Sequence, residues 1–337
     1  MIKTLITISI PVLNEEDNIG RLLERLRIVC DALKKYDFEF LFTDNASTDD
    51  TFAVLAEEAA KDKRVRVLRF SRNFGFQKSI LANYLNARGD AAIQIDADLQ
   101  DPPELFKEFL ESWEAGHKVV YGIRRRRKNE SFTMSSLRKL YYRLVASLAE
   151  TPLPKDAGDF RLIDRDIIEH LREYSDQAPY LRGMIATLGY PQTGIAYDRV
   201  SREAGQSKFN LSRLVQLGVD GICSQSTKPL RYITYFGFVT SIIAVLGAVF
   251  YAFSFFFAES SSGSRGFTTL AILVLLQTGL IAAFLGIIGE YIGRIFSNVR
   301  NSPIVIIEAQ IDRIGQKPKM QTGAGKSSRS IKVSKKD

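Results

Sequence analysis

The sequence predicts an α/β domain with a mostly parallel sheet, followed by two C-terminal transmembrane helices. Between residues 5 and 121, short apolar segments alternate with segments of helical period. This alternation is typical of parallel strands joined by helices that cover both faces of a sheet. Two later runs, Tyr232–Phe257 and Phe267–Ile288, contain no Asp, Glu, Lys or Arg. Each run exceeds the ~20 residues that a helix needs to span a bilayer.

The expected elements follow one another in chain order. Strands are expected at Leu5–Val12, Phe38–Thr43, Val65–Phe70, around Ile93 and at Lys118–Tyr121. Helices are expected after Asn14 and at Thr51–Lys61, Gln77–Arg88, Pro103–Ala115 and Arg165–Tyr174. Asn14 is the expected N-cap of the first helix, because a short polar side chain can accept a hydrogen bond from the first helical N–H groups.

With 337 residues, the chain is too long for one ordinary domain, so we expect a domain of catalytic size with an addition. The expected boundaries are a cytoplasmic domain at 1–210, an interfacial amphipathic helix at 211–230 and a transmembrane hairpin at 231–293. A short segment at 294–310, with a candidate strand at Pro303–Glu308, would lead to a disordered basic tail at 311–337.

Charge and composition narrow the class of protein. Two Cys and two His are too few for a disulfide framework or a zinc site built on thiolates and imidazoles. The net charge is +8, and residues 311–337 supply +6 of it, with eight Lys or Arg against two Asp. The tail therefore favours an anionic membrane surface. Nucleic acid is not an expected partner, because the arginine–aromatic pattern of such modules is lacking.

Basic residues also predict the orientation of the hairpin. Lys228, Arg231, Arg294 and Arg300 lie outside the two apolar runs, whereas Glu259 and Arg265 cancel in the connection between them. By the positive-inside rule, the domain at 1–210 and both termini are expected to be cytoplasmic.

An acidic segment, Ile93–Pro103, marks the expected functional edge of the sheet. A short apolar run ends in Asp96, Asp98 and Gln100, and ligands bind at the carboxyl ends of strands in open α/β sheets. Asp96 and Asp98 can turn towards one hard cation, and Gln100 offers a third oxygen. Taken alone, the segment is better explained as an acidic turn that caps the next helix, because Asp-x-Asp is a common sequence.

The first strand–helix turn excludes the common glycine-rich nucleotide sites. It reads Pro-Val-Leu-Asn-Glu-Glu, without a glycine triplet or a Gly-Lys-Ser/Thr sequence. A dehydrogenase and a P-loop NTPase are therefore disfavoured. A bound nucleotide would be held by carboxylates and a metal.

Four stretches, in order, resemble the family 2 glycosyltransferases, which have a GT-A (Rossmann-like) fold. They are Ile10–Glu15, Asp44–Asp49, Asp96–Pro103 and Gly158–Leu162, supported by Ser71–Gly75 and Gly205–Phe209. Within that family the chain resembles the polyisoprenyl-phosphate glycosyltransferases, namely dolichol-phosphate mannose synthases and bacterial undecaprenyl-phosphate glucosyltransferases. The resemblance covers roughly residues 5–230 and extends to the paired spans. The chain departs from the family at Asn45-Ala46, where Asp-Gly is the commoner pair.

The resemblance implies a role for each residue that matches. The nucleotide-sugar site would comprise Pro11, Glu15, Asp44, Asn73, Asp96, Arg202 and Lys208. Asp96, Asp98 and Gln100 would bind Mg²⁺ or Mn²⁺ on the diphosphate, and Arg124, Arg138 and Tyr142 would contact the acceptor phosphate. Asp98 and Asp159 would be the catalytic residues, with Asp159 the family's proposed general base.

Two readings of Asp159 compete with that of a general base. The second pKa of a phosphomonoester is about 6, so the acceptor is mostly dianionic at neutral pH and has little proton to give up. Asp159 is then expected to orient the nucleophile. A purely structural role, through a salt bridge to Arg161, is the simplest alternative.

The expected function is that of a membrane-bound inverting glycosyltransferase of cell-surface polysaccharide synthesis. It would move a sugar, with glucose expected, from a UDP-sugar to undecaprenyl or dolichyl phosphate. Gly286, Gly289 and Gly293 of the second span are expected to pack against the first span of the same chain, because Gly289-x-x-x-Gly293 permits close helix contact. A homo-oligomer built through the spans is expected as well. The alternatives are a membrane-tethered transferase with a non-prenyl acceptor and a non-catalytic membrane adaptor. A processive synthase is disfavoured, because Trp113 is the only Trp and lies outside a Gln-x-x-Arg-Trp motif.

Overall fold

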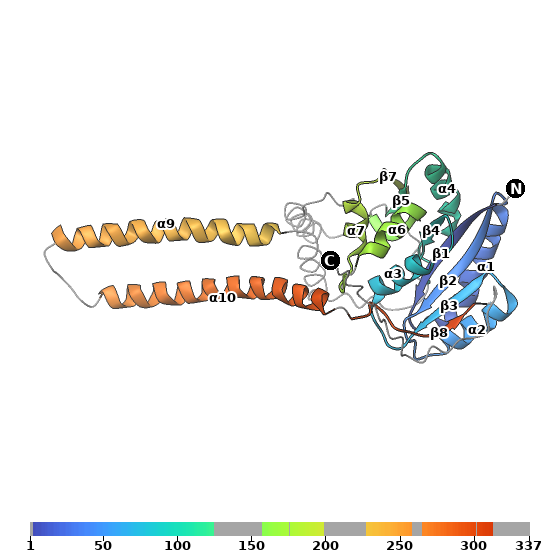
Figure 1. Ribbon diagram of the computed structural model, residues 1–337, viewed down its shortest axis with the longest axis horizontal. Coiled ribbons are helices and arrows are strands. Elements are labelled where there is room, and N and C mark those ends of the chain that lie inside the picture. The colour runs from blue at the N-terminus through green and yellow to red at the C-terminus, as the bar shows by residue number, and fades with distance from the viewer. Residues whose placement is uncertain are drawn as a thin grey trace, which may run out of the picture.

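The computed structural model describes residues 3–124, 157–174, 176–198, 227–257, 265–300 and 302–312. The first strands and helices of the sheet domain are β1 (Thr4–Val12), α1 (Glu16–Ala32), β2 (Tyr36–Asp44), α2 (Thr51–Lys61), β3 (Val65–Phe70), α3 (Phe76–Asn86) and β4 (Ala91–Gln94). They are followed by η1 (Pro103–Leu105), α4 (Phe106–Glu114), β5 (Val119–Arg124), β6 (Ala157–Asp164), α6 (Arg165–Glu173), α7 (Leu181–Thr187) and β7 (Gln192–Tyr197). Two long helices, α9 (Lys228–Phe257) and α10 (Arg265–Val299), then extend away from this domain, and the last strand, β8 (Ile307–Ile311), returns to it (Figure 1).

The strands form one eight-stranded sheet in the order β7-β5-β6-β4-β1-β2-β3-β8. Strand β1 is parallel to β2 and β4, β2 is parallel to β3, and β5 is parallel to β7. Strand β6 is antiparallel to β4 and β5, and β8 is antiparallel to β3. This confirms the predicted mostly parallel α/β sheet, with antiparallel strands at two places.

Two apolar clusters pack against opposite faces of the sheet. The larger cluster joins α1, α2 and α4 to inward-facing strand residues, among them Ile6, Ile8 and Ile10 of β1. The second joins α3, α6 and α7 to β4, β5 and β6. The period of two in β1 follows from the pleat of a strand, which sends alternate side chains to opposite faces. Helices on both faces are therefore confirmed.

The structure corrects two local expectations. Asn14 does not cap α1, because its backbone is left-handed (φ 57°) and its Oδ1 accepts a hydrogen bond from the N–H of Thr48 at 2.9 Å. The side chain therefore ties the loop after β1 to the loop after β2. The C-terminal strand is β8 at Ile307–Ile311 and not at Pro303–Glu308, so it reaches into the segment that was expected to be a disordered tail. The backbone N–H of Ser71 donates to the carbonyl of Ile306 at 3.1 Å, just before β8 begins.

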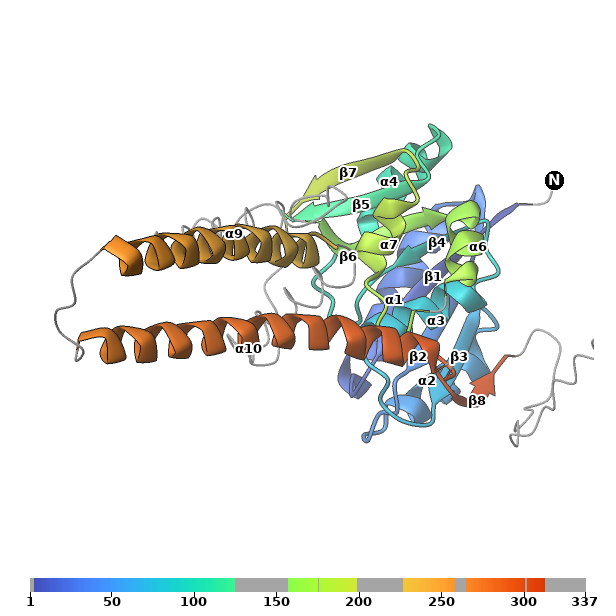
Figure 2. The ribbon, with the colours of Figure 1, turned by 60° about the vertical axis from the view of Figure 1, so that its left-hand side comes forward.

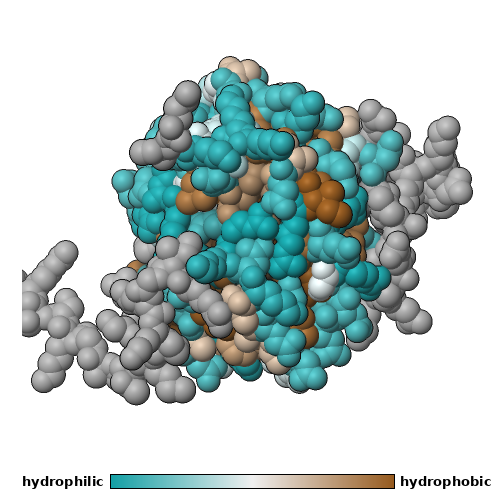
Figure 3. Space-filling model, turned by 90° about the vertical axis from the view of Figure 1, so that its right-hand side faces the viewer, coloured by the Kyte–Doolittle hydropathy of each residue, from teal (hydrophilic) through white to brown (hydrophobic). Residues whose placement is uncertain are grey.

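Helices α9 and α10 lie side by side and both point away from the sheet domain (Figure 2). They contain candidate membrane spans at Lys228–Gly247 and Gln277–Val299, chosen on length and composition. The rings of Phe236 and Phe284 contact each other across the pair, 5.7 Å between centroids. The face of the sheet domain that is turned away from α9 and α10 is mostly hydrophilic (Figure 3). This distribution is that of an aqueous domain carried by a membrane hairpin, while the cytoplasmic orientation stays a prediction.

The expectation that glycines of α10 contact α9 within this chain is wrong. A Cβ added to Gly286, Gly289 or Gly293 would meet no atom within 4 Å. A homo-oligomer stays a prediction. Most of the expected interfacial helix at 211–230 lies outside the described residues.

Candidate active site

The expected donor residues gather at one edge of the sheet. Strands β4, β1, β2 and β3 are parallel neighbours, so the segments that follow them emerge at the same edge. Pro11 and Glu15 lie at the end of β1 and just beyond it, Asp44 ends β2, and Asn73 follows β3. Asp96 and Asp98 follow β4 beside them.

The antiparallel strand β6 adds Asp159 to this edge. Gln94 of β4 is paired with Arg161 of β6, so continuing the register by two residues places Asp96 opposite Asp159. The charge of Asp159 acts on Asp96, because it contributes to raising the pKa of that carboxyl. Two residues that are distant in the sequence thus meet through strand pairing.

The edge is strongly acidic. Burial, and then the charges of Asp101, Asp159 and Asp98, raise the pKa of Asp96 to about 7, although Arg124 opposes the shift. Gln94 Nε2 donates to Asp96 Oδ1 at 3.3 Å, and the N–H of Gln100 donates to Asp98 Oδ1 at 3.2 Å. Because neighbouring carboxylates repel one another, a cation bound here would relieve this repulsion.

The donor atoms at this edge fit a divalent cation that binds together with a diphosphate. Within the described ranges no group of three or more His, Cys, Asp or Glu side chains is arranged to hold a metal alone. Asp96 and Asp98 offer two carboxylates, and Gln100 is buried beside them. Mg²⁺ is typically held by one or two carboxylates together with phosphate oxygens and water. The ligand set therefore suits a metal that arrives with its nucleotide.

Asp159 is held by a guanidinium that no sequence motif predicted. Arg182 of α7 donates from Nε to Oδ1 and from Nη2 to Oδ2, both at 2.9 Å. Arg161, the expected partner, also forms a longer ion pair with Asp159, Nη2 to Oδ1 at 3.9 Å, and donates to the carbonyl of Gly158. Burial alone would raise the pKa of Asp159, but the hydrogen bonds and charge of Arg182, aided by Arg161, lower it below 3.8. Asp159 is therefore an ionised, oriented carboxylate.

Arg124 is partly exposed, with 34% of its side chain accessible, and lies against the acidic cluster. At the end of β5, its Nε donates to Tyr197 Oη at 3.2 Å, and its Nη2 is 3.6 Å from Asp101 Oδ2. The guanidinium covers Gly158, where an added Cβ would come within 3.2 Å of Nη2. Tyr197 in turn donates to Asp101 Oδ1. Arg124 thus brings positive charge next to the carboxylates, at the C-terminal end of β5.

The sequence matches known glycosyltransferases over most of its length. The family model "Glycosyl transferase family 2" matches residues 7–172. The uncharacterized glycosyltransferase YkcC of Bacillus subtilis is 37% identical over 90% of this chain and 93% of its own length. The SfII prophage-derived bactoprenol glucosyl transferase of Shigella flexneri is 34% identical over 90% of this chain and 97% of its own. The chain belongs to the family 2 glycosyltransferases.

Solved structures resemble this family 2 glycosyltransferase more distantly. The mannosyltransferase PcManGT from Pyrobaculum calidifontis, in complex with GDP-Man and Mn²⁺, has a TM-score of 0.48 at 16% identity. The match covers 87% of this chain and 88% of that one.

The loop after β2 accommodates the departure from the usual Asp-Gly pair of these transferases. Ala46 keeps a left-handed backbone, with φ 61°, a conformation that glycine adopts without strain. Asn45 donates to Asn73 Oδ1 at 2.9 Å and accepts from the N–H of Phe74 at 2.8 Å, so it joins the loops after β2 and β3. Asp44 is fully buried, and its Oδ2 accepts no hydrogen bond, although Arg69 Nε lies 3.7 Å away. That oxygen is suited to receive a donor group of a ligand.

The other predicted site residues divide into two groups. Pro11 is buried, and Glu15 is fixed because its N–H donates to Thr51 Oγ1 and its carboxylate accepts from Asn18. The remaining four, Arg138, Tyr142, Arg202 and Lys208, lie outside the described residues. Arg182, Tyr197 and Gln77 belong to the site but were not predicted, because each is isolated in the sequence and reaches the site only through tertiary packing.

Proposed function

We propose that this enzyme transfers a sugar from a nucleotide donor, with UDP-glucose expected, to a polyprenyl phosphate at the cytoplasmic face of a membrane. The observation that carries this proposal is the direct joint between the catalytic domain and the apolar hairpin. Near the end of α10, Asn298 Oδ1 accepts from the N–H of Gln177 at 3.0 Å. Gln177 Nε2 also donates to the carbonyl of Ser302 at 2.6 Å. These bonds hold the active-site domain directly on the apolar hairpin, which supports an acceptor that lies in the bilayer.

The relatives support the same acceptor and sugar. Bactoprenol glucosyl transferases from Shigella flexneri and from Shigella phage SfV are each 34% identical to this chain. Their match extends through the helical hairpin, since it covers 90% of this chain. Their names support glucose as the sugar and a polyprenyl carrier as the acceptor.

The donor half of the reaction follows from the acidic edge. Asp96 and Asp98, with Gln100, would hold Mg²⁺ or Mn²⁺, which supplies positive charge for the departing diphosphate. Asp44, with its buried unbonded oxygen, would bind the nucleoside, and Asn73 and Glu15 would line its pocket beside Pro11. Arg202 and Lys208 are proposed to close over the diphosphate.

The acceptor half depends on Asp159 and Arg124. A lipid phosphate is mostly dianionic at neutral pH, since its second pKa is about 6. Asp159 is already ionised and held by Arg182, so it would orient the attacking oxygen or its cationic partners. Arg124, with Arg138 and Tyr142, is proposed to bind the acceptor phosphate. Direct attack on the anomeric carbon in one displacement would invert its configuration.

A comparison of acceptors and donors tests the proposal. The purified chain in mild detergent would be incubated with Mg²⁺ or Mn²⁺, a panel of radiolabelled UDP- and GDP-sugars, and either undecaprenyl phosphate or a short-chain alkyl phosphate. The expected result is label in the lipid phase with UDP-glucose and undecaprenyl phosphate, and none with Asp98→Asn. Equal transfer to the short phosphate would favour a tethered transferase with a non-prenyl acceptor. The absence of both sugar transfer and donor hydrolysis would favour a non-catalytic adaptor.

A further inference from the structure

The carboxylate of Asp159 is clamped by two helices that lie outside the quoted motifs. Arg182 of α7 forms two parallel hydrogen bonds with it, and Gln77 of α3 approaches Oδ2 at 3.5 Å. Gln77 Oε1 also accepts from the N–H of Leu181 at 3.3 Å, so it links the start of α7 to the same carboxylate. The clamp therefore comes from outside β6, the strand that carries Asp159.

The paired contact with Arg182 fixes an orientation as well as a charge. A guanidinium that donates to both oxygens of a carboxylate defines the plane of that carboxylate, whereas an ammonium acts as a point charge. The side chain of Asp159 is 13% exposed and that of Arg182 is 37% exposed. The carboxylate is thus shielded, while its partner is reached from solvent. Arg161 forms only a single longer ion pair with Asp159, at 3.9 Å, and does not make the paired contact that Arg182 makes.

The segment that leads into α7 is bonded to the membrane hairpin. Gln177 donates through its N–H to Asn298 of α10 and through its side chain to the carbonyl of Ser302. The chain then passes through Leu181, which Gln77 holds, and reaches Arg182. Hydrogen bonds at Gln177 and at Arg182, joined by the backbone of residues 178–181, therefore connect the end of α10 with the Asp159 carboxylate.

We propose that Arg182 is a positioning residue that fixes the carboxylate plane of Asp159, and that the Gln177 joint sets this pair at a defined place relative to the membrane. The inference rests on the proposed function, because only an acceptor held in a bilayer gives that placement a purpose. A lipid phosphate at the membrane surface can move laterally but hardly in depth, so the oxygen that orients it must stand at a matching depth. Misplacing reacting groups by about 1 Å can cost ~10² in rate.

Variants at Arg182 test the positioning role. Arg182→Ala is expected to lower kcat roughly 10²-fold, while the KM for the nucleotide sugar changes less than about threefold. Arg182→Lys should stay nearly as slow, because it restores charge without the fork. Added guanidinium should partly restore Arg182→Ala and should not restore Asp159→Asn. Arg172→Ala is the matched control, since Arg172 is 40% exposed and pairs with Glu169 away from the site.

Opposite outcomes would overturn the positioning role. Wild-type turnover in Arg182→Lys would show that charge alone suffices. A loss that guanidinium does not restore, together with a fall in unfolding temperature far beyond that of Arg172→Ala, would show a merely structural role. Calorimetric binding of UDP with Mn²⁺ shows whether each variant is folded at the donor site.

The double variant Gln177→Ala/Asn298→Ala tests the joint, because Gln177→Ala removes the bond to Ser302 and Asn298→Ala removes the acceptor of the Gln177 N–H. In reconstituted vesicles this double variant should lose turnover several-fold with undecaprenyl phosphate and bind UDP as the wild type does. Unchanged turnover would overturn the proposed role of the joint. Failure of the proposed function can be told apart from failure of this inference. It would appear in the wild-type chain as an absence of transfer to undecaprenyl phosphate.

Discussion

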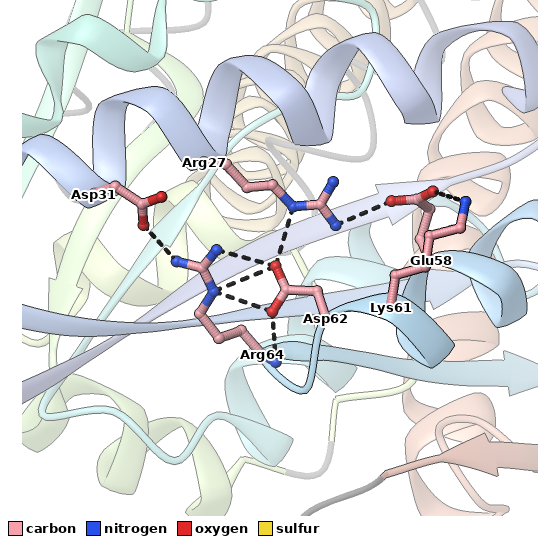
Figure 4. A network of polar contacts seen from close by, with 6 residues as sticks. All are labelled: Arg27, Asp31, Glu58, Lys61, Asp62 and Arg64. Atoms are coloured by element: carbon pink, nitrogen blue, oxygen red, sulfur yellow. Dashed lines mark hydrogen bonds and ion pairs between the residues drawn. The ribbon is translucent and has the colours of Figure 1, made fainter.

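An ion-pair network between α1 and α2 gives a quantitative prediction for stability. Asp62 lies between Arg27 and Arg64, Asp31 pairs with Arg64 at one end, and Glu58 with Lys61 forms the other end, so that charges of opposite sign alternate (Figure 4). Arg27 Nε donates to Asp62 Oδ2 at 3.0 Å, and Arg64 donates to both oxygens. Burial alone would raise the pKa of Asp62, but hydrogen bonds from Arg64 and Arg27 lower it from 3.8 to about 2.

The pKa shift sets an upper limit on the stabilisation. A fall from 3.8 to about 2 corresponds to at most about 2.4 kcal/mol. The side chains of Arg27 and Arg64 are 29% and 33% exposed, so solvent screening reduces the contribution to about 1 kcal/mol. Because the folded pKa is the lower one, this contribution is present above about pH 4 and is lost as pH falls towards 2.

Thermal unfolding of Asp62→Asn in detergent measures this contribution. At pH 7 the variant should unfold about 2–4 °C below the wild type, and the difference should shrink by about half near pH 3. Asp37→Asn is the matched control, because Asp37 is 62% exposed and only 3.6 Å from Lys3. A deficit that is equal at both pH values, or equal in the two variants, would refute the electrostatic reasoning.

Three further predictions concern the site and its loops. Asp98→Ala should abolish transfer while the protein stays folded, and excess EDTA should do the same to the wild type; full activity in EDTA would contradict the metal assignment. Ala46→Gly should raise the free energy of unfolding by about 0.5–1 kcal/mol, because it relieves a left-handed backbone, whereas Ala53→Gly, within exposed helix α2, should lower it. Asp159→Asn should lower turnover about 10²–10⁴-fold. The ratio of wild-type to variant turnover should stay constant between pH 6 and 9. Recovery of that variant at high pH would instead identify Asp159 as a general base.

The sequence predicted those parts of the fold that have local patterns. Strands β1 and β3 and helix α2 could be placed from apolar alternation and helical spacing alone. Strand β6 was not predicted, because Asp159 and Arg161 interrupt its apolar pattern and are tolerated only through partners from elsewhere in the fold. Asn14 failed as a cap because its side chain bonds to a loop that is distant in sequence.

The site was predictable only where its residues form motifs. The strand-end position of Asp96 and Asp98 was indicated by a buried apolar run that stops abruptly. Arg182 was not predictable, since nothing around it in sequence marks it, and its pairing with Asp159 is created by the packing of α7 beside β6. The place of Arg124 depends likewise on Tyr197, which comes from a strand at the far edge of the sheet.

Phosphorus NMR of the acceptor tests the central claim most directly. The purified enzyme, UDP-glucose, Mn²⁺-free Mg²⁺ buffer and undecaprenyl phosphate would be followed until the donor is consumed. The account predicts that the phosphomonoester signal of the lipid is replaced by a phosphodiester signal, with one UDP released for each lipid converted. Release of UDP while the lipid remains a phosphomonoester would contradict it, because the enzyme would then be transferring the sugar to water or to another acceptor.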